Sequence, residues 1–110
     1  MKWNRPLAIF MGVALAILLT ARAAAQDTPE ALYKAKCASC HAADGSGNTP
    51  VGKKLEVQDF KAPEVAKLSD SAFFDITKKG KGKMPAYDGK LTDAQINDLV
   101  KYIRGLEKAQ

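Results

Sequence analysis

The spacing of apolar residues predicts a helix near the end of the chain. After Thr92, apolar side chains recur at intervals of three and four residues, at Ile96, Leu99, Val100 and Ile103. This spacing is typical of an amphipathic helix with one buried face. Thr92 followed three residues later by Gln95 fits a capping box, so we expect the helix to begin there.

A second helix is predicted near residue 28. Thr28 suits the capping position and Pro29 suits the first helical position. The following residues carry no helix breaker, so we expect this helix to continue to the turn at residues 37–40.

The middle of the chain predicts two further helices. Pro63 opens a short candidate helix at residues 64–68, and Ser69 can cap the next one. This next helix ends at Gly80. It places three residues on one face, namely Phe73, Ile76 and Thr77.

No segment alternates apolar and polar residues as a strand would, so the fold class is all-α. Residues 44–51 are rich in Gly, Ser, Asn and Pro and form a loop. The predicted loops at 42–63 and 80–91 are long for so small a domain. We therefore expect a large apolar group to fill the centre.

The first 25 residues have the pattern of a secretory signal peptide. Lys2 and Arg5 precede an unbroken apolar run at residues 7–19, and residues 23–25 offer a small-x-small cleavage site. A membrane anchor is the alternative, but a span needs about 20 apolar residues. We expect residues 1–25 to be removed, with 21–23 as a second possible site. Residues 26–110 then form an exported, periplasmic domain.

The net charge changes with that cleavage. The full chain of 110 residues has 17 basic and 12 acidic residues, for a net charge of +5. Cleavage removes three basic residues, Lys2, Arg5 and Arg22, and no acidic one, which leaves +2. So small a charge is poor support for nucleic-acid binding. We expect neither a nucleic-acid partner nor a membrane span in the cleaved protein.

The only two cysteines, Cys37 and Cys40, stand directly before His41. This C-x-x-C-H pattern is the attachment signature of c-type haem. Residues three apart on a helical turn share a face, so both sulfurs can reach one edge of the macrocycle while His41 offers its imidazole to the iron. A zinc site would need a fourth ligand, and a thioredoxin-like pair would need a βαβ context. Haem attachment is the favoured interpretation.

The number of histidines and methionines in the chain limits the candidates for the second axial ligand of such an iron. His41 is the only histidine, which excludes a second histidine from this chain, and Met84 is the only methionine after the predicted leader. A Met thioether is a recognised partner of His and raises the reduction potential. Met84 lies in a Gly- and Lys-rich loop that is unsuited to core packing. An open sixth site or a lysine ligand are the alternatives.

These features make the chain similar to a known family. It resembles the class I c-type cytochromes, especially the short, soluble mono-haem ones, in five segments at residues 32–33, 37–41, 44–50, 80–85 and 99–103. The resemblance implies three to five short helices and long loops wrapped around one covalently bound haem c. It also implies a one-electron carrier, not an enzyme, with His41 and Met84 on the iron.

The resemblance implies further contacts. The first and last helices should cross, with Tyr33 near Leu99 and Tyr102. The carbonyl of Pro50 should accept a hydrogen bond from Nδ1 of His41 and so fix the ring. Many members carry Gly where this chain has Pro29, and that glycine lets the two helices approach closely. The detailed contact at the helix crossing can therefore differ in this chain. An aromatic residue often supports the haem propionates in this family, and Tyr87 is a candidate.

The lysines near Met84 indicate how partners could bind. Four lysines lie just before Met84, and two more follow Pro50. The six are Lys53, Lys54, Lys78, Lys79, Lys81 and Lys83. A basic collar would steer a monomeric carrier onto an acidic patch of a redox partner protein; a solvated loop is the alternative. Two other functions remain open: a haem enzyme or gas sensor with a labile Met84, and a haem subunit bound to a larger oxidase or dehydrogenase.

Overall fold

The computed structural model describes residues 28–109. The predicted leader at residues 1–25 lies outside these residues, so its removal stays a prediction. Within residues 28–109 the chain forms six helices: α2 (Pro29–Lys36), α3 (Ala38–His41), α4 (Pro50–Lys54), α5 (Pro63–Ala66), α6 (Asp70–Lys79) and α7 (Asp93–Lys108). Extended pairing in this part of the chain is confined to two isolated bridges, Lys81 with Met84 and Asp88 with Leu91. The all-α class is confirmed.

Within the described residues the structure has two helices more than the four that the apolar pattern predicts, and one more than the upper limit of the resemblance, for two local reasons. Cys37 has φ −118°, outside ideal helical geometry, and divides the first predicted helix into α2 and α3. Helix α4 falls in a segment that we had assigned to a loop. Its five residues include a proline and a glycine, so its composition resembles that of a turn.

The predicted helix boundaries are confirmed at their caps. Thr28 and Ser69 accept hydrogen bonds from the first turns of α2 and α6. At α7, the Thr92 hydroxyl accepts from the Gln95 amide at 3.1 Å, and the Gln95 side chain accepts from the Thr92 amide at 2.9 Å. This capping box satisfies two amide donors that the helix itself leaves free.

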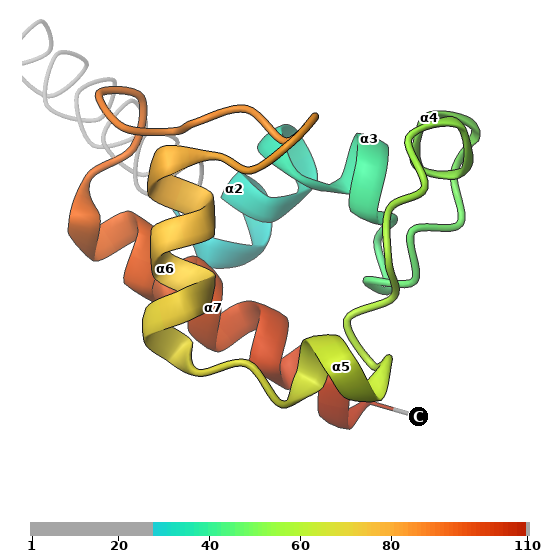
Figure 1. The fold of residues 1–110 in the computed structure, drawn as a ribbon. Coiled ribbons are helices and arrows are strands. Elements are labelled where there is room, and N and C mark those ends of the chain that lie inside the picture. Colours follow the sequence, from blue (N-terminus) through green and yellow to red (C-terminus); the bar gives the residue numbers. More distant parts are fainter. Residues whose placement is uncertain (1–27, 110) are drawn as a thin grey trace, which may run out of the picture.

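The core forms where α7 packs against α2 and α6 (Figure 1). Tyr33 on α2 and Leu99 on α7 are almost fully buried in one apolar cluster. The rings of Tyr33 and Tyr102 lie 5.1 Å apart between centroids, so the expected crossing of the first and last helices is present. It forms although Pro29 stands where the resemblance implies a glycine.

Arg104 joins α7 to the connection between α5 and α6. Its guanidinium donates to the carboxylates of Asp70 and Glu107, at 2.8 and 2.9 Å, and to the carbonyls of Ala66 and Leu68. It also lies over a ring of α6, that of Phe73, at 4.2 Å from the centroid. This arrangement fixes the position of α6 relative to α7.

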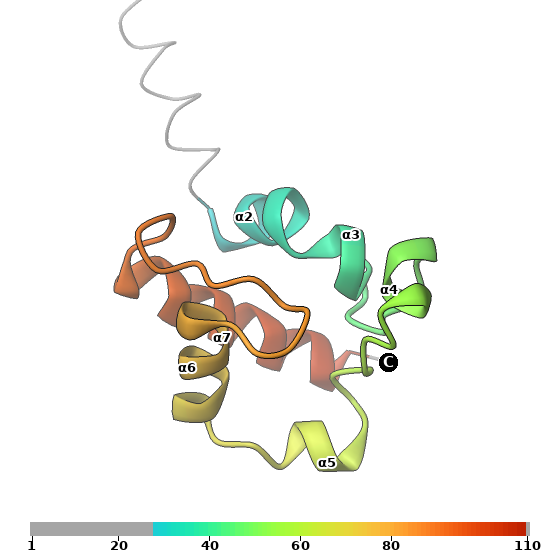
Figure 2. The ribbon, with the colours of Figure 1, turned by 45° about the horizontal axis from the view of Figure 1, so that its top comes forward.

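The loop that follows α6 extends towards the side of the molecule that carries α3 and α4 (Figure 2). Its far end is held on α6, because the amides of Tyr87 and Asp88 donate to the carbonyls of Thr77 and Lys78. None of the helices formed by residues 28–109 is both long and apolar enough to cross a membrane.

Candidate functional site

A cavity of about 640 Å³ lies between α3, α6, α7 and the loop after α6. Its walls include both cysteines and His41, and also Met84, which follows His41 by 43 residues in the sequence. Most other lining side chains are apolar, such as Phe73 on α6. Cavities of this size and character are typical of sites for small molecules and cofactors. The structure therefore brings four of the predicted site residues to one place.

The attachment motif forms a single helical turn. The amides of Cys40 and His41 both donate to the carbonyl of Cys37, at 3.2 and 2.9 Å. Both cysteines are unpaired and half-buried. Burial raises the pKa of the Cys37 thiol to about 11, so it carries a proton at neutral pH. A reactive thiolate of the kind found in disulfide oxidoreductases needs the opposite shift.

His41 has the protonation state that a metal ligand needs. Burial lowers the pKa of His41, which favours the neutral imidazole. Its Nδ1 atom is buried and has no hydrogen-bond partner among the described residues. The ring of His41 is stacked on the ring of Phe60.

The expected hydrogen bond from His41 to Pro50 is not formed. Pro50 is the first residue of α4, where its carbonyl is directed along the helix towards residue 54. Pro50 is also exposed and does not line the cavity. The contact between this segment and the attachment motif is made instead by its neighbours Thr49 and Gly52.

Thr49 and Gly52 pack against the turn at Cys37–His41, which we call the attachment turn. The Thr49 hydroxyl donates to the carbonyl of Ser39 at 2.7 Å and accepts from the amide of Gly52 at 2.8 Å. A Cβ atom at Gly52 would lie 2.3 Å from the carbonyl oxygen of Cys40, so only glycine fits here. Sequence analysis missed both residues. The one local signal was a threonine directly before a proline, which suits a helix start.

Met84 is presented by a tight turn. The backbones of Lys81 and Met84 exchange two hydrogen bonds, at 3.2 and 3.0 Å, around Gly82, which has φ +58°. Gly80 has φ +76°, and a Cβ atom there would lie 2.8 Å from the Met84 carbonyl oxygen. Met84 is half-buried at the cavity wall. The loop geometry thus fixes the backbone of the predicted sixth ligand.

Tyr87 connects this loop to α2. Its hydroxyl donates to the carbonyl of Lys36 at 2.9 Å, next to the attachment motif. The suggested role of Tyr87 beside the haem propionates is therefore not supported by its observed partner. Its ring still lines the cavity.

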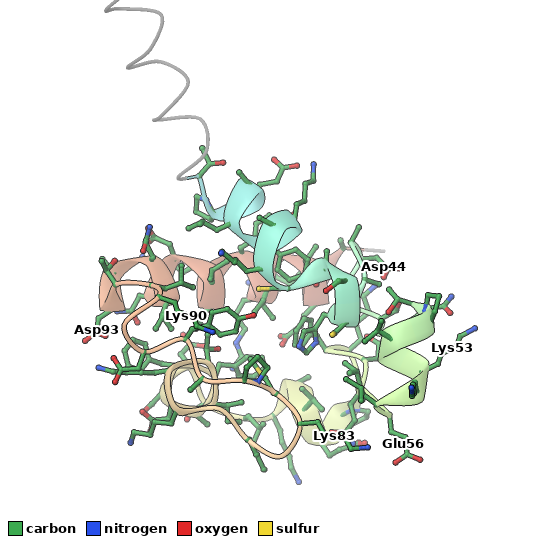
Figure 3. The ribbon with its side chains drawn as sticks, turned by 90° about the horizontal axis from the view of Figure 1, so that it is seen from above. Asp44, Lys53, Glu56, Lys83, Lys90 and Asp93 are labelled. Carbon is green, nitrogen blue, oxygen red and sulfur yellow. The ribbon has the colours of Figure 1, made fainter. Side chains whose placement is uncertain are left out.

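The lysines of the predicted collar occupy three different environments. Lys78 forms an ion pair with Asp93 at 3.0 Å, and Lys79 lies 4.0 Å from Asp75. Lys81 and Lys83 are exposed at the cavity. The remaining two are on α4 and do not line the cavity, namely Lys53 and Lys54. Figure 3 shows Lys53 and Lys83 on separate elements. Lys36, which we had not included, also lines the cavity.

The donors around the cavity fit a covalently attached haem. Two free thiols lie on one helical turn, and a neutral imidazole follows directly. A thioether lines the same cavity, and apolar side chains form most of its walls. In the part of the chain described here, no group of three or more His, Cys, Asp or Glu side chains could hold a metal ion by itself. The all-helical fold and this donor set define the class as the c-type cytochromes.

Comparisons with known proteins agree with this class. The family described as "Cytochrome C oxidase, cbb3-type, subunit III" matches residues 24–103. Cytochrome c-555 of Chlorobaculum tepidum is 38% identical over 103 residues, which cover 87% of this chain and 92% of that protein. Cytochrome c6 of Thermosynechococcus vestitus is 32% identical over 95 residues, which cover 84% and 82%.

A solved structure is also similar. The KustC0563 c-type cytochrome superposes with a TM-score of 0.67 at 31% identity, and the match covers 74% of this chain and 99% of that one. The chain belongs to the family of class I c-type cytochromes. It is accordingly a one-electron carrier with one covalent haem c, and not an enzyme.

Proposed function

We propose that this protein is an exported, diffusible electron shuttle whose haem is bonded to Cys37 and Cys40 and whose iron is bound by His41 and Met84. The observation that carries the proposal is the shared cavity, which collects these four side chains from two distant segments. When bound, the haem supplies an iron that alternates between the ferrous and ferric states. Residues 1–25 support export, because they have the pattern of a secretory leader.

The protein's own residues set the properties of that iron. The soft sulfur of Met84 favours the ferrous state and raises the reduction potential. The apolar walls, including Phe73 and Leu99, also oppose the additional charge of the ferric state. Because the turn around Gly82 and the hydrogen bond of Tyr87 hold the Met84 loop, the ligand set can stay unchanged between the two states, which favours rapid electron transfer.

Replacing Met84 tests the ligand assignment. We expect Met84→Ala and Met84→His to lower the reduction potential and to abolish the far-red absorption band that sulfur ligation gives to ferric haem. Ile76→Leu changes the same cavity wall without changing a donor, and it should retain the band. A wild-type spectrum without the band, or a Met84→Ala potential equal to that of the wild type, would remove Met84 from the ligand set.

Carbon monoxide and gel filtration separate the other functions. A closed His–Met site does not bind carbon monoxide at neutral pH, so binding to the reduced wild type would favour a haem enzyme or gas sensor. We expect the protein in a native extract to elute as a small monomer whose mass equals residues 26–110 plus one haem. Elution with a large complex would favour a permanently bound subunit.

We also propose that redox partners dock at the cavity through an acidic patch. Lys81 and Lys83 are exposed beside the cavity, and Lys36 lines the same rim. Among the described acidic residues, only Glu56 lines this cavity. Such an imbalance attracts a negatively charged surface and increases the rate of encounter.

A further inference from the structure

The ring of His41 lies flat against the ring of Phe60. The two ring centroids are 4.7 Å apart, and the planes differ by 13°. A metal-binding histidine normally has its ring orientation fixed by a hydrogen bond from its second nitrogen. Here Nδ1 of His41 is buried and has no such partner in the described part of the chain. The stacked ring is therefore the contact available to fix this plane.

Phe60 is itself held in place from several sides. Only 7% of its surface is exposed. Its amide donates to the carbonyl of Gly45 at 3.0 Å, and a Cβ atom at Gly45 would lie 2.7 Å from the Phe60 ring. On another side the ring of Phe73 contacts it, with centroids 6.1 Å apart and planes at 47°. A ring confined in this way can transmit its orientation to the imidazole that stacks on it.

We propose that Phe60 is the positioning residue for the axial ligand His41 and that its ring sets the plane of the imidazole. The inference rests on the proposed function, since it takes His41 as the ligand. The plane of an axial imidazole determines how its π orbitals overlap with the iron d orbitals. Phe60 therefore controls the magnetic anisotropy of the ferric protein without touching the iron.

The first test uses the wild-type holoprotein. In the reduced, diamagnetic state, nuclear Overhauser effects should connect ring protons of Phe60 with ring protons of His41. Their absence from an otherwise assigned spectrum would overturn the proposal. This measurement needs no variant, so it gives an answer even if every substitution at this site prevents folding.

The second test compares two phenylalanines of the core, one in contact with His41 and one not. Phe60→Leu keeps an apolar side chain but removes the flat face, so we expect shifted EPR g values and redistributed hyperfine shifts of the haem methyl groups. Phe74→Leu is the control, because Phe74 also packs against the core but makes no ring contact with Phe60 or His41 in the described residues and does not line the cavity. Phe60→Tyr should restore the wild-type pattern.

Two outcomes distinguish this inference from the ligand assignment. If Phe60→Leu retains the far-red band but has the EPR spectrum of the wild type, the positioning role is wrong and the ligand set stands. If the wild type itself lacks the band or shows no histidine ligation, the proposed function fails first.

A second variant, Gly45→Ala, should displace the Phe60 ring and move the g values as well; unchanged g values there would also contradict the proposal.

Discussion

The buried hydroxyl of Tyr33 donates a 2.7 Å hydrogen bond to the carbonyl oxygen of Ala42. Tyr33 is fully buried on α2, and Ala42 directly follows His41. Ala42 has φ +65°, a conformation that non-glycine residues rarely adopt. The hydrogen bond holds the chain at the point where it turns away from the proposed ligand. Through Tyr33, helix α2 thus helps to fix the backbone at Ala42, directly after His41.

Removing this hydroxyl should destabilise the holoprotein. Tyr33→Phe removes one of the two hydrogen bonds that the Ala42 carbonyl accepts, the other coming from the Gly45 amide at 3.2 Å, so we expect a loss of about 0.5–1.5 kcal/mol. Denaturant unfolding of the two holoproteins measures the difference. Tyr102→Phe is the control, because this tyrosine is half-buried and no hydrogen bond of its hydroxyl is recorded in residues 28–109. Equal losses from the two variants would contradict the assigned role of Tyr33.

The same tyrosine should make the stability sensitive to alkali. Burial raises the pKa of Tyr33 far above its ordinary value of about 10. When the pH exceeds the ordinary pKa of about 10, the unfolded chain releases the phenolic proton of Tyr33 while the folded chain retains it. The unfolded state then binds fewer protons than the folded state. The unfolding free energy should then fall as the pH rises, by up to about 1.4 kcal/mol per pH unit for one proton.

Unfolding titrations from about pH 9 to about pH 12 check this expectation. Below the unfolded-state pKa the contribution of Tyr33 to stability is complete and constant. Tyr33→Phe carries no titrating group at this position, so its stability should decline less steeply than that of the wild type. Parallel slopes for the two proteins would show that Tyr33 titrates normally.

Gly52 should tolerate no side chain. A Cβ atom there would lie 2.3 Å from the carbonyl oxygens of both Cys40 and Gly47, and neither backbone can move freely. We expect Gly52→Ala to cost about 1–3 kcal/mol through overpacking. It should also lower the fraction of exported protein that carries haem, because the carbonyl of Cys40 belongs to the attachment turn. Haem content per polypeptide and unfolding curves measure the two effects.

Gly105 provides the matched control for that substitution. It lies within α7, and no atom beyond its own helix is within 4 Å of an added Cβ. Gly105→Ala should therefore stabilise the protein by about 0.5–1 kcal/mol, the usual gain from replacing a helical glycine. The proposed close approach at Gly52 would be refuted if both alanine variants gained stability.

Tyr87→Phe should weaken the hold of Met84 on the iron. The variant loses the hydrogen bond to the Lys36 carbonyl that connects the Met84 loop to α2, worth about 0.5–1.5 kcal/mol. In a titration towards alkaline pH, we expect the far-red band of the ferric protein to disappear at a lower midpoint pH than in the wild type. Tyr102→Phe should leave this midpoint pH unchanged. A midpoint that stays the same in Tyr87→Phe would show that the turn at Gly82 alone is sufficient.

The docking proposal predicts that the position of a lysine matters more than its charge. Replacing Lys81 and Lys83 by Gln should slow electron transfer with an acidic partner roughly 2- to 10-fold at low ionic strength. Replacing Lys53 and Lys54 by Gln changes the net charge equally but on α4, away from the cavity. Both differences should shrink as salt screens the charges. Equal effects of the two pairs would argue against docking at the cavity.

Local sequence signals predicted much of this fold. The caps at Ser69 and Thr92 depend on residues three positions apart, so they are visible in the sequence and confirmed in the structure. The C-x-x-C-H motif is equally local. It predicts a single helical turn, which the structure forms from Cys37 to His41, while the attachment of haem to this turn stays a prediction.

Contacts between distant segments could not be predicted in this way. The stack of Phe60 on His41 joins residues 19 positions apart and has no spacing rule. The hydrogen bond from His41 to Pro50 was transferred from a resemblance, and it failed because a helix begins at Pro50. Whether a short Pro- and Gly-containing segment forms a helix depends on packing against its neighbours, which composition does not reveal.

The position of Arg104 bears on the order in which the walls of the cavity form. Its partners Ala66 and Asp70 precede it by 38 and 34 residues, so these bonds close a long loop at a considerable entropic cost. The single turn from Cys37 to His41 needs no such closure. The thiol-bearing turn can therefore form before Arg104 joins α6 to α7, so the side of the cavity that α6 lines closes after the side that carries the thiols.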